Sequence, residues 1–425
     1  MSRSYWASIL LSVYLASTLV SMASMSIGLL FLVAAIFVAR PDPHATRAWF
    51  YQSSWIRNYL ILSGSLFLAC VVSLLGATFM PVTIGGVSIH VQWPQDLMKA
   101  WYLLLPLLSL VALKSLDEID RERPIRIWLC TAAVLCVVGF FQHFTGWPRP
   151  QLIPFDLHDR FHVTLFLGHH LTVASVFIFP VFFSLDRFWT LRKEKNSFLY
   201  GVLFLFGAIA LILTFARSAW VSLPFGVLVW VCLRFSRKVL LASVLVVALV
   251  AGVLYMKSEG VRRRIEMSQY IGISERYDLW EANYDFFKMR PLTGLGWRKA
   301  SDLSGPYLQQ KYPDRKEVFA GHAHNNFIEM ASSTGLFGLA AWLGWCGYIF
   351  FSLLRLARKT KAPGAGGLVA AWAAFHVNGL TQVNFWEGKV IHQLMWATAL
   401  GGFLILSQKS EVLPKVSTVD PRAQT

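Results

Sequence analysis

Gly-His-Ala-His-Asn-Asn, residues 321–326, leads directly into an apolar run that extends from residue 327 to residue 354. The run is long enough to cross a bilayer, whose hydrocarbon core needs about 20 apolar residues in a helix. Two imidazoles and two amides therefore lie at the mouth of a membrane helix, where polar groups are rare unless they serve a purpose. They also end the longest polar segment of the chain, residues 257–325. We infer a reaction centre at the membrane surface.

The composition extends this interpretation to the whole chain. Of its 425 residues, 56% are hydrophobic and 15% are charged, whereas soluble domains carry about 25% charged residues. Apolar runs near the length of a bilayer span recur at residues 6–22, 24–39, 58–80, 97–113, 127–144, 163–185, 198–215, 219–233, 239–256, 327–354, 366–384 and 390–407. The first two could be one long helix, because only a patch rich in Ser and Met near Ser21 separates them. We predict an all-α polytopic membrane protein with about 12 transmembrane helices.

Lysine and arginine are concentrated in alternate connections between these runs. Three or four such residues occur in each of the connections 40–57, 114–126, 186–197, 234–238 and 355–361, and the short connections between them hold two at most. Positive charge in short loops marks the cytoplasmic side, so we predict an inner-membrane protein with both termini in the cytoplasm. The segment 257–325 then forms one large outer loop that contains helices, and in a bacterium it faces the periplasm.

We treat the chain, 1–425, as a single membrane domain. Its net charge of +16 is mostly cytoplasmic anchoring, but the outer loop is basic as well. The positive charge of this loop is explained either by a solvated surface or by attraction to phosphates and anionic lipid headgroups. The tail, 408–425, is polar and contains two prolines, so we expect it to be disordered.

Several catalytic classes find no support in the sequence. All five cysteines fall inside apolar runs and none forms a CxxC pair: Cys70, Cys130, Cys136, Cys232 and Cys346. Neither disulfides nor a zinc site is therefore expected. The chain also has no P-loop, dinucleotide-binding fingerprint, G-x-S-x-G elbow or HExxH motif. We expect no cofactor, no bound metal and no energy from ATP.

The outer loop carries a helix of its own, from Ser274 to a stop at Pro291. Its aromatic residues recur at helical spacing, as Tyr277, Trp280, Tyr284 and Phe287. This stripe either packs against the rest of the protein, which we favour, or lies on the membrane as interfacial aromatics do. In both cases the helix holds Arg276 close to the membrane, and a Gly-rich turn at 291–297 follows it.

His324 stands immediately before the predicted helix, which Asn325 or Asn326 could cap. A helix N-terminus disfavours positive charge and so favours the neutral imidazole, the form that accepts a proton. A lone histidine more often has a capping or interfacial role, but the cluster with His322 and both asparagines favours a functional one. Small residues at 332–338 suit close helix packing, which we prefer to a space for a lipid chain.

Three arginines are candidates for binding phosphate oxygens, which the guanidinium fork fits well. Arg217 lies between two apolar runs with almost no loop, so it must sit at the headgroup level, where snorkelling is the alternative explanation. Arg276 could instead pair with nearby carboxylates on its own helix. Arg160, in the outer connection before the span 163–185, is the weakest of the three.

Two adjacent histidines, His169 and His170, fall about two turns into the predicted span 163–185, and His162 precedes them. Neighbouring side chains diverge on a helix, so metal binding by the pair has poor geometry. A polar contact to substrate or to another helix and simple packing remain equally open.

The region around His324 resembles a known motif. His324-Asn325, then nine residues, Gly335, two residues and Gly338 is similar to the H-[NSQ]-x9-G-x2-[GTY] pattern of bacterial O-antigen ligases. These enzymes share a superfamily with O-antigen polymerases and some protein O-oligosaccharyltransferases. The plan of twelve spans with one large outer loop agrees with that family over nearly the whole chain.

The stretches around Arg276 and at 291–296 resemble the element that precedes the family's histidine, and Phe-Ala-Arg217-Ser also fits its place. The resemblance implies a metal-independent, inverting glycosyltransferase embedded in the membrane. It implies a donor of O-antigen polysaccharide on undecaprenyl pyrophosphate and an acceptor hydroxyl on lipid A–core. It maps the family's essential histidine and two arginines onto His324, Arg276 and Arg217.

Around these three catalytic candidates we expect substrate contacts from Arg160, His169, His170, His322 and Asn325. The partners expected are the two lipid-linked substrates and membrane lipids, and no nucleic acid. An O-antigen polymerase would usually have two large outer loops, and a protein O-oligosaccharyltransferase a longer chain. A lipid-linked sugar transporter would have inverted repeats and charges at mid-membrane, and neither is found here.

Overall fold

The computed structural model describes residues 2–153, 160–266 and 274–410, and these residues are mostly helical. A helix meets each predicted apolar run: α1 (Arg3–Val20), α2 (Met22–Ala39), α4 (Ser54–Phe79), α6 (Leu105–Lys114), α7 (Glu118–Thr145), α8 (His170–Thr190), α9 (Ser197–Leu213), α10 (Arg217–Arg234), α11 (Arg237–Lys257), α15 (Asn326–Lys359), α16 (Ala365–Asn378) and α17 (Gly388–Ser410). The remaining elements are α3 (Pro43–Gln52), β1 (Thr83–Ile84), β2 (Val87–Ser88), α5 (Trp93–Met98), the 3-10 helix η1 (Lys99–Leu104), α12 (Glu259–Glu266), α13 (Ser274–Met289) and α14 (Ala300–Lys311). The predicted disordered tail lies outside the described residues beyond Ser410.

Among the described residues, eight helical stretches are long and apolar enough to cross a membrane. They comprise α2, α4, the run from α5 through η1 to α6, α7, α8, α11, α15 and α17. The other helices that meet predicted runs, α1, α9, α10 and α16, do not reach that length and hydropathy. The all-helical, multi-pass character is therefore supported, and the total of twelve spans stays a prediction.

The first two apolar runs form two helices and not one. Ser21 ends α1 in an extended conformation, and its side chain accepts a hydrogen bond from the backbone of Ser24. The Ser24 hydroxyl accepts one in return from the Ser21 backbone, which completes a capping box at the start of α2. The two helices then pack against each other.

The predicted span 163–185 begins too early, because α8 starts only at His170. The buried side chain of Gln142 on α7 accepts hydrogen bonds from the backbone N–H groups of Thr164 (3.0 Å) and Leu165 (2.8 Å). These N–H groups are thereby satisfied without a helix. His169 is therefore the N-cap of α8, and the prediction that it lies two turns inside a span is wrong.

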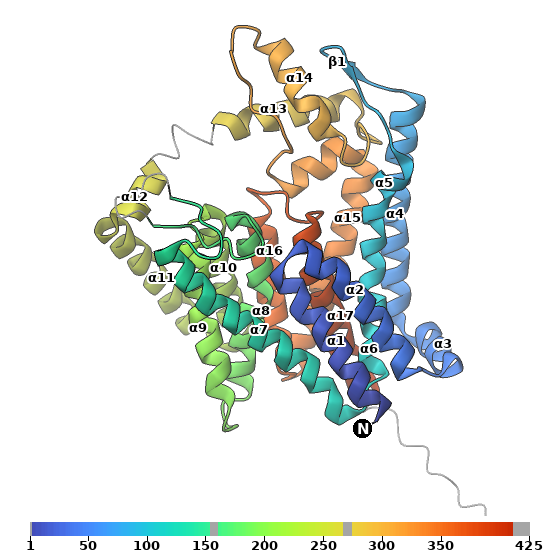
Figure 1. Ribbon diagram of the computed structural model, residues 1–425, viewed down its shortest axis with the longest axis vertical. Coiled ribbons are helices and arrows are strands. Elements are labelled where there is room, and N and C mark those ends of the chain that lie inside the picture. The colour runs from blue at the N-terminus through green and yellow to red at the C-terminus, as the bar shows by residue number, and fades with distance from the viewer. Residues whose placement is uncertain (1, 154–159, 267–273, 411–425) are drawn as a thin grey trace, which may run out of the picture.

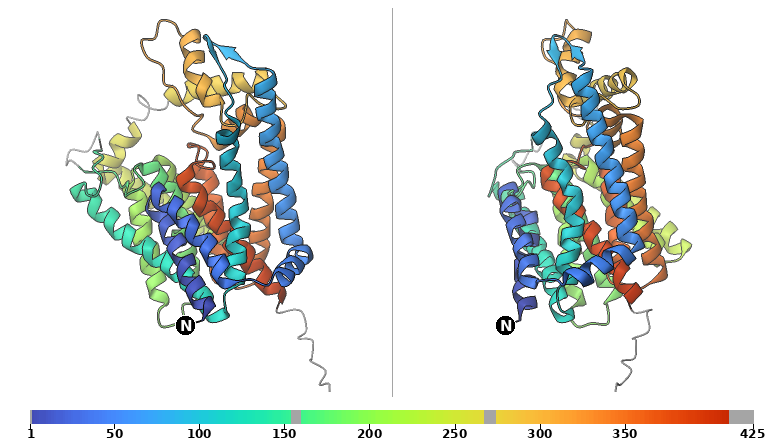
Figure 2. Two further views of the ribbon diagram at one scale, coloured as in Figure 1. Left: turned by 45° about the vertical axis from the view of Figure 1, so that its right-hand side comes forward. Right: turned by 90° about the vertical axis from the view of Figure 1, so that its right-hand side faces the viewer.

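The outer loop and the start of the chain occupy opposite ends of the helical bundle. Figures 1 and 2 show α13 and α14 beside the β1–β2 hairpin at one end, with α3 and the first residues of α1 at the other. A second, smaller core holds the outer elements together, and it includes Ile84, Leu279, Phe286 and Leu303. The predicted helix from Ser274 to the stop at Pro291 is confirmed as α13.

The long helix α15 is broken at Gly335, whose φ of 64° and ψ of −165° suit glycine almost alone. The turn after α13 fills the break. The N–H of Leu295 donates to the carbonyl of Ser332 (2.9 Å), and the N–H of Leu336 donates to the carbonyl of Pro291 (2.8 Å). Backbone groups that the kink would leave open are therefore paired, as a membrane protein requires. This junction fixes α13 against the first turns of α15.

Candidate functional site

Two asparagines at the start of α15 hold the preceding segment in place. This segment, residues 321–324, carries His322 and His324 and is called the histidine loop. The Asn325 side chain caps the helix, because its Oδ1 accepts from the N–H groups of Phe327 (2.8 Å) and Ile328 (3.2 Å). Its Nδ2 donates to the carbonyl of Leu380 (3.0 Å), in the connection between α16 and α17. Asn325, a predicted substrate contact, thus has its amide engaged within the protein.

Asn326 pins the same connection from inside the protein. Its buried Nδ2 donates to Oδ1 of Asn384 (2.6 Å), and its Oδ1 accepts from the N–H of Asn384 (3.0 Å). The connection 379–387 is thereby held beside the histidine loop. The predicted run 366–384 is helical only to Asn378, because this asparagine network replaces the end of the helix.

Two side chains clamp the residue between the histidines. The N–H of Ala323 donates to Oε2 of the buried Glu329 (2.9 Å), and its carbonyl accepts from the indole Nε1 of Trp280 on α13 (2.7 Å). The next residue, His324, has a φ of 48°. That left-handed conformation is uncommon for a residue with a side chain and costs energy, so the loop holds His324 in a fixed pose.

The His324 imidazole lies in a positively charged surrounding. Its ring centroid is 4.2 Å from that of His322, and its backbone N–H donates to Nδ1 of His322 (3.3 Å). Its own Nδ1 is buried and has no hydrogen-bond partner among the described residues. Burial, followed by the charges of His322, Arg276 and His169, lowers the pKa of His324 to about 3. The ring is therefore neutral at physiological pH and able to accept a proton.

A cavity of about 530 Å³ opens in front of this histidine. His169, His322 and His324 line it, so three of the predicted site histidines share one space. Five charged side chains line it as well: Lys99, Arg298, Glu329, Glu387 and Lys389. Burial raises the pKa of Glu387, whose carboxylate accepts hydrogen bonds from Thr172 and Gln382.

The two predicted arginines line a neighbouring cavity of about 310 Å³. Arg217 is the first residue of α10, and Arg276 lies in the first turn of α13. Trp280 lines this cavity too, and its indole Nε1 donates to the loop that carries His324. The connection after α16 contributes to both cavities, with Leu380 lining the arginine cavity and Gln382 the histidine cavity. The structure therefore brings Arg217, Arg276 and His324 into one region.

A further arginine, which the sequence analysis did not single out, belongs to the same region. Burial, together with the charges of Arg217 and Arg276, lowers the pKa of Arg264 on α12 to about 10. A guanidinium whose pKa responds to two others lies close enough to feel their fields. Arg264 does not line the arginine cavity, but its charge adds to the positive field of Arg217 and Arg276, which suits an anionic ligand.

The other predicted contacts are positioned differently. His170 lines neither cavity and is stacked between His162 (4.4 Å between ring centroids) and His169 (4.5 Å). His162 is anchored by its Nδ1, which lies 2.8 Å from the carbonyl of Thr214, three residues before Arg217. The histidine stack therefore links His169, which lines the histidine cavity, to the turn that precedes Arg217. Arg160 lines neither cavity and has its guanidinium over the ring of Phe144, 4.4 Å from the centroid.

The sequence did carry signals for the charged groups that were missed. Glu329 is a carboxylate one turn inside an apolar run, where an ionisable residue is a functional candidate by default. Lys99 and Lys389 stand at the outer ends of the runs 97–113 and 390–407, where the rule for cytoplasmic anchors does not call for them. Within the described residues, no three His, Cys, Asp or Glu side chains are grouped in a way that could hold a metal ion.

Comparison with known protein families gives one match. Residues 202–343 match the family model described as O-antigen ligase. The matched segment is about a third of the chain and contains Arg217, Arg276 and His324. It supports membership of the O-antigen ligase superfamily, which the sequence motifs had indicated. No curated protein matches the chain.

Proposed function

We propose that this protein is an O-antigen ligase of the bacterial inner membrane. It transfers O-antigen polysaccharide from undecaprenyl pyrophosphate to a sugar hydroxyl of lipid A–core at the periplasmic face, with inversion and without a metal ion. The observation that carries the proposal is the shared cavity of Arg217 and Arg276 next to the cavity of His324, with Trp280 lining the first and hydrogen-bonded to the loop of the second.

His324 is the proposed general base. A sugar hydroxyl is a weak nucleophile, and removal of its proton by a positioned imidazole accelerates attack by about 10² to 10⁴. The hydroxyl oxygen attacks the anomeric carbon of the donor as its proton passes to His324. The anomeric C–O bond to the diphosphate breaks on the opposite face, so the configuration at that carbon inverts.

Arg217 and Arg276 serve the leaving group. The diphosphate gains negative charge as the glycosidic bond breaks, and fixed guanidinium groups stabilise charge where it develops. Because guanidinium groups supply this stabilisation, the mechanism we propose needs no metal ion. Arg264, whose pKa responds to both of them, strengthens the same field.

Donor binding and base strength are coupled in this arrangement. A pKa of about 3 makes the free imidazole of His324 a weak base. The diphosphate brings negative charge next to Arg276, one of the groups that depress this pKa, and so raises it toward the working pH. The imidazole is therefore a stronger base when the donor is bound than when the site is empty.

The decisive experiment is lipopolysaccharide gel analysis of a deletion strain that expresses either the native protein or His324→Ala. For a ligase, deletion removes every ladder band and lets undecaprenyl-linked polymer accumulate. The native gene restores the ladder, and His324→Ala does not, although the variant is present in membranes in equal amount. Normal ladders with His324→Ala would reject its role as the base.

The same gel separates the alternatives within and outside the superfamily. A band with a single repeat unit after deletion would mean an O-antigen polymerase. Unchanged ladders would mean another role, such as a protein O-oligosaccharyltransferase or a transporter of lipid-linked sugars. The ligase is favoured because the candidate residues line two cavities that share the connection after α16, and because only one outer segment is long.

A further inference from the structure

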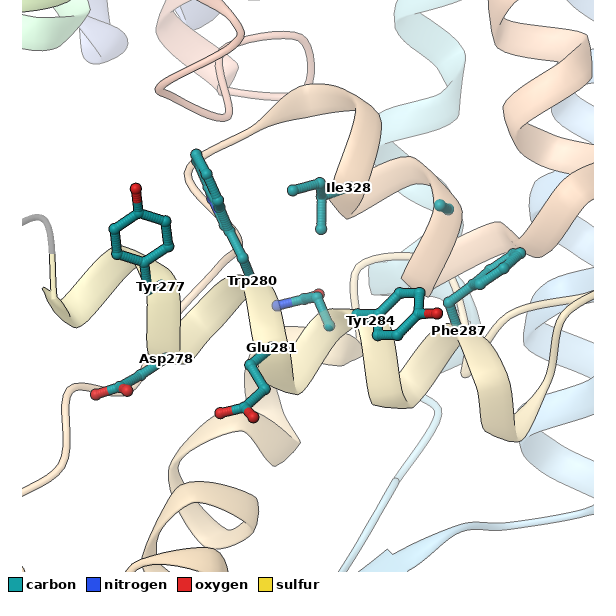
Figure 3. A pocket seen from close by; sticks show the side chains of 9 residues that line it. Tyr277, Asp278, Trp280, Glu281, Tyr284, Phe287 and Ile328 are labelled. Atoms are coloured by element: carbon teal, nitrogen blue, oxygen red, sulfur yellow. The ribbon is translucent and has the colours of Figure 1, made fainter.

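An aromatic groove of about 530 Å³ runs along α13 beside the first turns of α15. Figure 3 shows Tyr277, Trp280, Tyr284 and Phe287 projecting from successive turns of α13, with Ile328 of α15 facing them. These four residues are the aromatic stripe of the sequence. The Gly335 junction fixes α13 against α15 and thereby holds the floor of the groove in place.

The stripe does not form the packing face of α13. Leu279, Ala282 and Phe286 are fully buried in the outer core, whereas Tyr277 and Tyr284 expose 61% and 60% of their surface. The expectation that the stripe packs against the rest of the protein therefore does not describe these two tyrosines. Large aromatic rings held open on a rigid helix form a surface ready for a ligand.

The groove is continuous with the proposed diphosphate site. Tyr277 and Trp280 line both the groove and the cavity of Arg217 and Arg276. A ligand whose diphosphate occupies the arginine cavity has the groove as its next available surface. The two remaining aromatics, Tyr284 and Phe287, lie one and two turns further along α13, away from the arginines.

We propose that this aromatic groove binds the saccharide chain of the donor, beyond the sugar that reacts. A pyranose ring has an apolar C–H face and a rim of hydroxyls, so it stacks on an aromatic ring and donates hydrogen bonds at its edge. The groove offers both partners, because the carboxylates of Asp278 and Glu281 flank its aromatic rings. The inference rests on the proposed function and adds to it a track that holds a long polymer.

A polyprenyl tail fits the groove less well. Asp278 is paired with Arg315, and Glu281 is paired with Lys311 (3.0 Å). These ion pairs are exposed, as in a surface that faces water, and charged groups of this kind are costly against a lipid chain. The ammonium of Lys288 lies over one face of the Tyr284 ring, 4.6 Å from its centroid. The groove is thus amphipathic, as a carbohydrate surface is.

The test compares donors of two lengths on the purified protein in liposomes. Both donors carry undecaprenyl pyrophosphate, one with a single repeat unit and one with long polymer. We expect the double variant Tyr284→Ala/Phe287→Ala to raise KM for the polymer about 3- to 10-fold, the effect of losing two stacking contacts. The single-repeat donor should keep its KM, and kcat should be unchanged for both.

Two controls make the result decisive. Tyr284→Trp/Phe287→Trp keeps the rings and should keep the native KM, and Tyr51→Ala removes an exposed ring from α3 at the opposite end of the bundle. A KM for the polymer that stays at the native value in the double alanine variant would overturn the proposal. A third donor with a shorter prenyl chain tests the lipid tail, and a rise in KM that depends on prenyl length would also overturn the proposal.

Failure of the proposed function gives a different pattern from failure of the groove. If His324 is not the base, His324→Ala transfers both donors normally, whatever the groove variants do. If only the groove proposal is wrong, His324→Ala abolishes transfer of both donors, and the groove variants show no dependence on polymer length. Binding of the free O-polysaccharide to the native protein and to the double alanine variant, followed by isothermal titration calorimetry, checks the groove without any turnover.

Discussion

At the scale of single residues, the proposed chemistry depends on the protonation state of His324, which several neighbouring side chains set together. His324 is neutral because it is buried next to His322 and within the field of Arg276. Asn325 and Asn326 contribute by holding the loop, and their amides are engaged with the protein itself. At the start of α15, His324 therefore has the proposed chemical role, and the two asparagines have a structural one.

The protonation of His324 can be measured directly. Its pKa is lowered to about 3, so the neutral ring should persist at pH values where an ordinary histidine, with a pKa of about 6.5, is already charged. We expect an NMR titration of the histidine ring protons, assigned with His324→Gln, to give a pKa well below 6.5. Inorganic pyrophosphate should raise it, because an anion near Arg276 favours the charged ring.

Two results would contradict this account of His324. One is an ordinary pKa in the free protein, which would mean that the loop is open to water. The other is a pKa that does not move although pyrophosphate binds, which would separate the arginine cavity from the histidine. Arg276→Gln is the matched variant, and it should raise the pKa of His324 without any ligand, because it removes a positive neighbour.

Arg217 is predicted to act through the shape of its guanidinium and not through charge alone. Arg217→Lys keeps the charge but loses the planar fork that binds two phosphate oxygens. We expect transfer to fall on the order of 100-fold, the size of effect seen when one donor to a developing charge is lost. Arg192→Lys, at an exposed position between α8 and α9, should leave transfer unchanged. Full activity of Arg217→Lys would mean that Arg217 only anchors α10.

At the scale of elements, the site depends on the junction between α13 and α15. The glycines of that junction allow two backbones to touch. A Cβ added at Gly335 would lie 2.3 Å from the carbonyl carbon of Leu292, and one added at Gly294 would lie 2.3 Å from that of Ser333. The spacing from His324 to Gly335 is therefore a structural requirement, because the kink must fall where the turn enters.

Gly335→Ala should consequently disrupt both fold and function. Its φ of 64° is unfavourable for alanine, and its Cβ meets main-chain atoms that cannot move aside. We expect a loss of thermal stability of several degrees and a fall in transfer. Gly64→Ala is the matched control, since a Cβ there meets nothing within 4 Å and alanine suits the interior of α4. Equal stability of the two variants would show that the junction is not needed.

Most of the helices could be predicted from hydropathy, and the differences between predicted and observed helices have physical causes. The helix predicted to begin at residue 163 begins only at His170, because the side chain of Gln142 pairs with backbone N–H groups that a helix would otherwise satisfy. The gathering of Arg217 with Arg276 could be guessed only from the family motif, because nothing local in the sequence links α10 to α13. Lys99, Arg298 and Lys389 reach the histidine cavity from three separate elements or connections, a convergence that depends on tertiary packing.

At the scale of the whole molecule, the two ends of the helical bundle differ in structure and in proposed function. The outer elements α13, α14 and the β1–β2 hairpin lie at the end opposite to α3 and the start of α1 (Figure 1). Both cavities are lined in part by residues of the outer segment 257–325. This polarity agrees with the predicted orientation, in which basic connections face the cytoplasm. A donor anchored in the membrane and an acceptor anchored in the same leaflet could then meet at one surface.

Site-directed thiol labelling tests this orientation in intact cells. Gln309→Cys on α14 and Lys195→Cys between α8 and α9 place the new thiol at exposed positions. Both are made in a variant whose exposed native cysteines, Cys130 and Cys232, are replaced by serine. We expect a membrane-impermeant maleimide to label Gln309→Cys in cells whose outer membrane is permeabilised, and Lys195→Cys only after lysis. The reverse pattern would direct His324 to the cytoplasm, where polymer on undecaprenyl pyrophosphate and lipid A–core do not meet, and the ligase proposal would fall with it.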